Sequence, residues 1–246
     1  MKMISAMALA LAAATPVHAG EWEFILNPYL MLPNSSGKFG IGPFDTNVSA
    51  SPSDLFSKLN WGFMGAVEAN NGDWGFNLDV SYLNLDITDD SIRRVSVNGH
   101  QAAYTATVLK RVHQNAWVYA GIRWSDMGVR LTCNTVCAVP TGNAPGIAQR
   151  ELSRNQDWQE VLVGFRANLP FNERLDLTMN ADVGGFGAGS EVSINVWPQL
   201  GWRVSESSKA LLGYRIVYVK HESEEGVRFL YDVVTFGPTI GFEYRF

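Results

Sequence analysis

Histidines are the first residues to test for catalysis, because imidazole titrates near neutral pH and can act as a general base. Beyond residue 20 the chain has only His100, His113 and His221. His221 is followed by Glu222 and Ser223, so a base, an acid and a nucleophile are adjacent in the sequence. A lipid or peptide hydrolase is therefore one hypothesis. The sequence has no G-x-S-x-G elbow, Walker loop or dinucleotide fingerprint that would indicate other enzyme chemistry.

The two cysteines, Cys133 and Cys137, are too few for a disulfide scaffold or a cysteine-rich metal domain. No histidine lies near them in the sequence, so we expect no metal ion and no cofactor. In an oxidising compartment the pair is expected to form a loop disulfide. Closing so short a loop adds little entropy-based stability, so its expected role is to stiffen the loop.

Charged residues at alternate positions form the largest candidate site. They are Glu68, Asp79, Arg123, Glu160, Arg166, Asp182, Arg215 and Glu243. Both signs are present, and buried charges must pair because an unpaired buried charge is strongly destabilising. Two interpretations follow, an ion-pair network that fills a closed interior or a narrow polar pathway for small solutes. The elements that carry these residues decide whether they meet.

Those elements are predicted to be strands, because apolar and polar residues alternate along most of the chain. From Trp74 to Tyr82 every second residue is large and apolar, whereas the residues between them are small or polar. The pattern predicts ten strands, with eight or twelve as alternatives. They lie near residues 22–33, 60–70, 73–87, 97–112, 115–129, 157–169, 174–186, 191–204, 208–221 and 230–246.

The links between these strands mostly alternate in length. Short links contain Asn71-Gly72, a type I′ hairpin signal, and His113-Gln114, whereas longer links fall near 34–59 and 130–156. Short turns on one side and long loops on the other are typical of bacterial outer-membrane barrels. The predicted fold is therefore an all-β, closed antiparallel up-and-down transmembrane barrel, a single domain over residues 20–246.

The first 19 residues have the features of a signal peptide. Lys2 supplies a positive charge, residues 4–14 are apolar, and Val17-His18-Ala19 fits a cleavage site. We expect residues 1–19 to be removed after export through the inner membrane. After residue 20 no apolar run is long enough for a transmembrane helix, so any membrane must be crossed by strands.

The composition agrees with a barrel whose outer face contacts lipid. Only 17% of residues are charged while 12% are aromatic, and the five clearest apolar strand faces contain no Lys or Arg. A basic residue on such a face would be costly in a membrane. A secreted β-sandwich is the alternative with the same alternation. The net charge of −5 argues against nucleic acid as a partner.

The link at 34–59 contains a helix start signal. Ser51 can act as the N-cap, with Pro52 in the first helical position and Asp54 in the third. The apolar side of this helix would consist of Leu55, Phe56 and Leu59. Residues 38–49 would add a hairpin above the membrane.

The C-terminal residues Gly241-Phe242-Glu243-Tyr244-Arg245-Phe246 resemble the C-terminal signal of outer-membrane proteins. In such proteins a terminal Phe follows apolar or aromatic residues at every second position, and the barrel-assembly machinery reads the signal. The resemblance implies that Phe242, Tyr244 and Phe246 are the assembly signal of this chain.

The front half resembles a family of uncharacterised proteobacterial outer-membrane barrels. The residues that carry the resemblance are Trp22-Glu23-Phe24, Pro28-Tyr29-Leu30, a Gly-rich stretch from Gly37 to Gly42, Ser53-Asp54-Leu55, Glu68, and Asp73-Trp74-Gly75 with Asp79 and Tyr82. It covers most of the chain after residue 20. It implies a barrel in the cell outer membrane, with lipid and the assembly machinery as partners and no defined reaction. We therefore expect a structural or surface-interaction role, with a small-solute pore and the hydrolase at His221 as alternatives.

Overall fold

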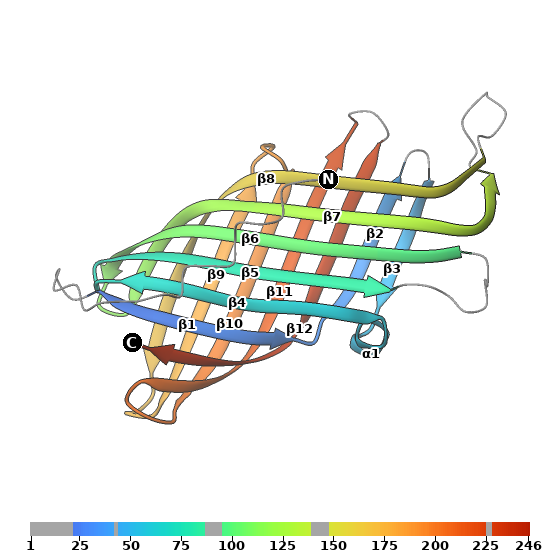
Figure 1. The fold of residues 1–246 in the computed structure, drawn as a ribbon. Coiled ribbons are helices and arrows are strands. Elements are labelled where there is room, and N and C mark those ends of the chain that lie inside the picture. The colour runs from blue at the N-terminus through green and yellow to red at the C-terminus, as the bar shows by residue number, and fades with distance from the viewer. Residues whose placement is uncertain (1–21, 42–43, 87–94, 139–147, 225–227) are drawn as a thin grey trace.

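The structure, a computed structural model, describes residues 22–41, 44–86, 95–138, 148–224 and 228–246. The signal peptide expected at residues 1–19 lies outside these ranges. Ten strands form a closed antiparallel barrel (Figure 1), which confirms the predicted fold class and strand number.

Each barrel strand pairs with the next one along the wall, and the last pairs with the first. The ten strands are β1 (Glu23–Met31), β4 (Leu59–Asn70), β5 (Trp74–Asp86), β6 (Val95–His113), β7 (Ala116–Ala138), β8 (Ala148–Pro170), β9 (Leu175–Gly185), β10 (Val192–Arg203), β11 (Ser208–Ser223) and β12 (Phe229–Arg245). We call the end with the turns after β4, β6, β8 and β10 the lower end. Both chain ends of the barrel lie there, because Leu26 is paired with Tyr244.

Two further strands, β2 (Asn34–Ile41) and β3 (Phe44–Ala50), form a hairpin at the upper end. β1 and β2 use the same edge of β12 one after the other. β1 pairs with residues 239–245, and β2 pairs with residues 229–236. The hairpin agrees with the one expected at residues 38–49 and begins four residues earlier.

The helix α1 (Pro52–Ser57) follows the hairpin and confirms the predicted short helix. Its N-cap is Ser51, whose backbone N–H donates to Asp54 Oδ2 at 3.0 Å while Asp54 N–H donates to Ser51 Oγ at 3.3 Å. This reciprocal capping box satisfies donors that the helix start would otherwise leave unpaired. In the described part of the chain no helix is long and apolar enough to span a membrane.

β7 and β8 are longer than predicted, with 23 residues each. We expected a loop at 130–156, but pairing between the two strands continues to Ala138, with a shift of register after Thr132. The loop prediction was wrong because backbone pairing does not require the apolar–polar alternation on which the prediction depended. Cys133 and Cys137 therefore lie on β7, and their expected disulfide involves side chains outside the described ones.

Large apolar side chains point outward from the wall. Phe63, Phe76, Val163, Leu212 and Ile240 are each 50–57% exposed. Inward positions on the same strands carry polar residues, and 13 polar or charged residues are buried in the described chain. This is the reverse of a soluble barrel, in which the apolar face fills the interior. The closed ring also excludes the β-sandwich alternative.

The interior contains two buried apolar clusters. We call the one behind β1 and β4 the wall cluster; it consists of Tyr29, Met31, Met64 and Trp197, with Leu83 packed against it. We call the other the upper cluster; it consists of Trp158, Val219, Phe229, Tyr231 and Val233. Both limit the open space inside the barrel.

Candidate functional site

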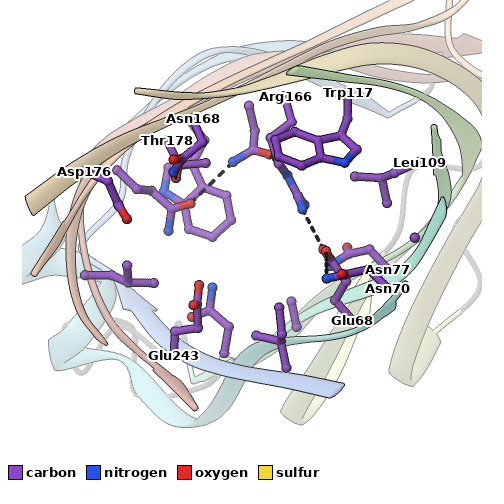
Figure 2. A pocket seen from close by; sticks show the side chains of 18 of the residues that line it. Glu68, Asn70, Asn77, Leu109, Trp117, Arg166, Asn168, Asp176, Thr178 and Glu243 are labelled. Atoms are coloured by element: carbon purple, nitrogen blue, oxygen red, sulfur yellow. Dashed lines mark hydrogen bonds and ion pairs between the residues drawn. The ribbon is translucent and has the colours of Figure 1, made fainter. Parts of the chain in front are cut away.

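A cavity of about 450 Å³ occupies the lower part of the barrel interior. Figure 2 shows Glu68, Trp117, Arg166, Asp176 and Glu243 reaching into it from different parts of the wall. Its lining extends down to the turn between β8 and β9. At its upper end lie four of the predicted charged residues, Asp79, Arg123, Asp182 and Arg215.

Ion pairs connect the walls around the lower cavity. Arg166 on β8 donates to Glu68 on β4 through Nη1 at 2.7 Å, and this contact crosses the open interior (Figure 2). Lys209 pairs with Asp176 at 2.5 Å. At the rim Arg245 pairs with Glu243 at 2.8 Å. The charges that line the cavity thus largely neutralise one another.

Arg123 on β7 lies at the centre of a buried charged layer. Its Nη1 donates to Glu160 at 2.9 Å, and its Nη2 donates to Asp182 at 2.8 Å. The three side chains are only 6%, 0% and 5% exposed. Ser193 donates to the same Glu160 oxygen at 2.6 Å. One cation here faces two acids, so each buried carboxylate has a charged partner.

Arg215 on β11 continues the layer to the opposite wall. It donates to Asn195 at 2.9 Å and to the hydroxyl of Tyr29 at 2.8 Å, and it lies 3.4 Å from Asp79 on β5. Its guanidinium also lies over the ring of Trp197, 4.6 Å from the centroid. The charged layer therefore reaches β1 and β5 from β11.

Asn195 joins the two halves of the layer. Its amide nitrogen donates to Asp182 at 2.7 Å, and its amide oxygen accepts from Arg215. An unbroken chain of contacts thus runs from Arg123 through Asp182, Asn195 and Arg215 to Asp79. We call this chain, with Glu160, Ser193 and Tyr29, the central layer.

The upper cluster lies further up the same interior. Trp158 on β8 packs against Phe229 and Tyr231 on β12, with ring centroids 6.3 and 6.0 Å apart. His221 stacks on Trp158 at 4.4 Å with the rings nearly parallel. Trp158 and His221 are 6% and 5% exposed, so this stack is a packed plug of rings rather than a wet channel.

The contacts of His221 do not match those of a catalytic base. Its Nδ1 lies 2.7 Å from the carbonyl oxygen of Gly189 and therefore carries the proton, while Nε2 is buried without a partner in the described structure. Glu222 is on the opposite face of β11 and accepts from Arg228 at 2.7 Å. His100 instead lies by Asp126 and stacks on Tyr82. The sequence neighbours His221 and Glu222 thus point to opposite faces of β11.

The eight predicted charged residues all face the interior, but they belong to two levels. Asp79, Arg123, Glu160, Asp182 and Arg215 are in the central layer, whereas the lower cavity holds the other three. The sequence prediction missed the uncharged members Tyr29, Ser193 and Asn195. It also missed two uncharged residues in contact with the layer, Trp197 and Thr105, which accepts from Arg123. The alternation along each strand could have identified these residues, because each lies an even number of positions from a charged residue of the same strand and therefore points to the same inner face.

The expected assembly signal lies at the seam of the barrel. Phe242 and Tyr244 point outward and are 42% and 39% exposed. Phe246 is 71% exposed, and its backbone N–H donates to the carbonyl oxygen of Phe24 at 2.9 Å. Within the described ranges no group of three His, Cys, Asp or Glu side chains is placed to hold a metal ion.

No family model and no curated protein matches this chain in sequence. Solved structures do match its fold. The outer membrane protease OmpT from Escherichia coli has a TM-score of 0.57 at 9% identity, over 92% of this chain and 97% of OmpT. The translocator domain of the autotransporter NalP from Neisseria meningitidis has a TM-score of 0.45 at 12% identity, over 94% of this chain and 90% of the NalP domain. Ail of Yersinia pestis has a TM-score of 0.41 at 13% identity, over 92% of this chain and 99% of Ail. The likeness shows that this chain has the fold of an outer-membrane β-barrel.

Proposed function

We propose that this outer-membrane barrel is closed to solutes and has a structural or surface-interaction role at the cell surface. The observation that carries the proposal is the central layer, whose side chains from β1, β5, β7, β8, β9, β10 and β11 meet inside the barrel. Solute passage would require these buried contacts to open.

The energetics of the central layer oppose a pore. Separating Arg123 from Glu160 and Asp182 would leave buried charges without partners, which costs about 3–5 kcal/mol for a broken buried pair. The upper cluster is a second barrier of different chemistry, because packed rings do not replace the water that hydrates an ion. A narrow pathway would have to cross both, so the lower cavity is best understood as a vestibule with a closed upper end.

The length of the upper wall supports a role outside the membrane. A transmembrane strand needs about 9–11 residues, whereas β7 and β8 have 23 each. In Figure 1 β6, β7 and β8 extend well beyond the ends of β1, β4 and β5. With β2 and β3 they present a β-surface above the membrane. We propose that this surface carries the interaction role of the protein.

Planar-bilayer recording tests the closed state. We expect the purified barrel to insert without conductance steps across a range of salts and small charged solutes. The double variant Arg123→Ala, Trp158→Ala removes one member of each barrier and should produce steps, which proves that insertion was achieved. Arg228→Ala, at an exposed ion pair, is the matched control and should remain silent. The proposal would be overturned if the wild-type protein showed conductance steps and if Arg228→Ala and the double variant showed the same steps.

Thiol labelling of intact cells tests the surface placement. Asn47→Cys on β3 should react with a membrane-impermeant maleimide, and Asn172→Cys in the lower turn should react only after lysis. The reverse pattern would contradict an upper end outside the cell. The wild-type protein controls for reaction of its own two cysteines.

We also propose the route by which the chain reaches this membrane. The proposal rests on the signal-like residues 1–19 and on the C-terminal Phe246. N-terminal sequencing of the protein from outer membranes should begin at Gly20, and Phe246→Ala should leave more of the protein unassembled in the periplasm. Normal assembly of that variant would remove the support for a C-terminal signal.

A further inference from the structure

The barrel wall parts between β1 and β4. The two strands pair from Glu23 opposite Asn70 up to Pro28 opposite Gly65, and their pairing ends there. Above that point β1 remains paired with β12, and β4 remains paired with β5. Proline suits such an ending because it has no N–H to donate to a neighbouring strand.

A cavity of about 230 Å³ lies where the strands part. Its lining combines outward residues of the wall, such as Leu30 and Phe63, with the buried Met31 and Met64 of the wall cluster. Outward and inward residues of a wall point to opposite faces of the sheet, so both kinds can line one cavity only where the cavity passes between two strands. The cavity is therefore a lateral recess that leads from the outer face of the barrel into its wall.

The recess is apolar along its described lining. Its one polar side-chain atom there is the Tyr29 hydroxyl, which already contacts Asp79 at 2.9 Å and Arg215 at 2.8 Å. Behind it Trp197 donates its indole N–H to Thr239 at 3.0 Å. A sugar, a peptide or an ion would lose its hydrogen bonds to water in this recess and find few in return.

With the upper end outside the cell, as proposed above, the height of the recess places it in the outer half of the membrane. Crossing takes about 9–11 residues of a tilted strand, and β4 has 12, from Asn70 at the lower end to Leu59 at the upper end. Gly65 is therefore near mid-membrane, and Leu59 is at the outer boundary. Trp61, stacked on Tyr82 at 4.5 Å, lies at that boundary, where aromatic rings are favoured.

The helix α1 covers the upper end of the recess. Leu55 and Phe56 contribute to the lining, and Phe56 is 37% exposed. The helix itself has no buried residue, so its apolar side is not satisfied by the protein alone. Its apolar side thus continues the lipid-facing surface over the top of the recess.

We propose that this recess binds one acyl chain of an outer-leaflet lipid, held end-on between β1 and β4 beneath α1. An apolar cavity of about 150 Å³ stays dry and takes up a small hydrocarbon, and this recess is larger and is continuous with the lipid-facing belt. Its volume is smaller than the roughly 300 Å³ or more of typical small-molecule sites, so it fits an acyl chain rather than a bulky ligand.

Photo-crosslinking in nanodiscs tests this binding. The full-length barrel is placed in phosphatidylethanolamine and phosphatidylglycerol with a trace of phospholipid that carries a diazirine near the end of one acyl chain. Mass spectrometry should locate crosslinks on Met31 and Met64, which are 6% and 9% exposed and out of reach of lipid that only surrounds the barrel.

Filling the recess should remove these crosslinks. We expect Leu59→Trp and Leu85→Trp each to lower labelling of Met64 by about tenfold, the loss that follows from expelling roughly two methylenes. The matched control Val163→Trp, on an outward position of β8, should leave the labelling unchanged. Heat-modified migration on gels verifies that each variant is folded.

Two results would overturn the proposal. One is labelling spread evenly over outward residues with none on Met31 or Met64. The other is labelling of Met64 that persists in folded Leu59→Trp and Leu85→Trp barrels. Neither result depends on conductance, so a failed recess and an open lumen are distinguishable.

Discussion

At the residue scale, Tyr29 joins the central layer to the barrel wall. Its ring packs on Trp197 at 4.8 Å, and its hydroxyl contacts Asp79 and Arg215. One side chain thus lines the lateral recess and, through its hydroxyl, also bridges the ion-paired Asp79 and Arg215 by hydrogen bonds. A sequence pattern cannot display this double use, because the partners of Tyr29 are 50 and 186 residues away.

Arg123→Ala should be among the most destabilising single substitutions in the barrel. It leaves Glu160 and Asp182 buried without their cation, for a cost of about 3–5 kcal/mol. Urea unfolding in detergent micelles measures the loss. Arg228→Ala is the control, because its ion pairs are exposed and such pairs contribute about 0–1 kcal/mol. Equal effects of the two substitutions would contradict a buried central layer.

The cap of α1 should depend on pH in one direction. The hydroxyl and backbone N–H of Ser51 lower the pKa of Asp54 below its ordinary 3.8. A depressed folded pKa means that the carboxylate's contribution is complete above pH 3.8 and is lost as the pH falls through the folded value. NMR titration should show α1 unchanged between pH 5 and 8 and loosened in stronger acid.

The same titration of Ser51→Ala is the control for this cap. The substitution should move the pKa of Asp54 upward, because its largest stabilising hydrogen bond is removed. An unshifted Asp54 in that variant would show that Ser51 is not the cause.

At the element scale, the turn between β9 and β10 is tied to β8 and β11. Gly187 and Gly189 both have positive φ, at 78° and 83°. A Cβ on Gly187 would meet open space, whereas one on Gly189 would collide with the carbonyl oxygen of Gln159 on β8. The carbonyl of Gly189 also accepts from His221 on β11. This turn therefore holds the upper cluster in place.

These two glycines form a matched pair for a stability test. Gly187→Ala should cost about 1–2 kcal/mol from the left-handed backbone alone. Gly189→Ala should cost at least twice as much, because the backbone of β8 must also shift. Denaturant unfolding of both variants under one set of conditions provides the comparison. A Gly189→Ala barrel as stable as Gly187→Ala would contradict the close approach of this turn to β8.

Some of these elements could be predicted from the sequence, and others could not. The alternation predicts the ten strands because one face meets apolar surroundings along most of their length. It fails at residues 130–138 and 148–156, where β7 and β8 pair beyond the predicted limits. For the central layer, parity places Arg123 and Asp182 inside, but only the barrel's register brings Arg215 from β11 to Asp79 on β5.

At the scale of the whole molecule, the outward apolar belt is the surface that a membrane would stabilise. Val163→Arg places a charge within this belt and should cost about 2–4 kcal/mol near mid-membrane. Folding into phospholipid vesicles at graded urea concentrations measures this cost. The control Val204→Arg lies at a lower turn, where the expected cost is about 0–1 kcal/mol. Equal costs at the two sites would place the belt outside the membrane core.

The seam between β1 and β12 also determines when the molecule can exist as a ring. Ile25 is opposite Arg245, so 245 − 25 = 220 residues separate these partners in sequence. Strands β4 to β11 can pair with their neighbours as they become available, but the last pairing requires the final residues of β12. Until β12 pairs with β1, the sheet has two unpaired strand edges that can join other chains. Protection of those edges before closure is therefore a requirement of this topology.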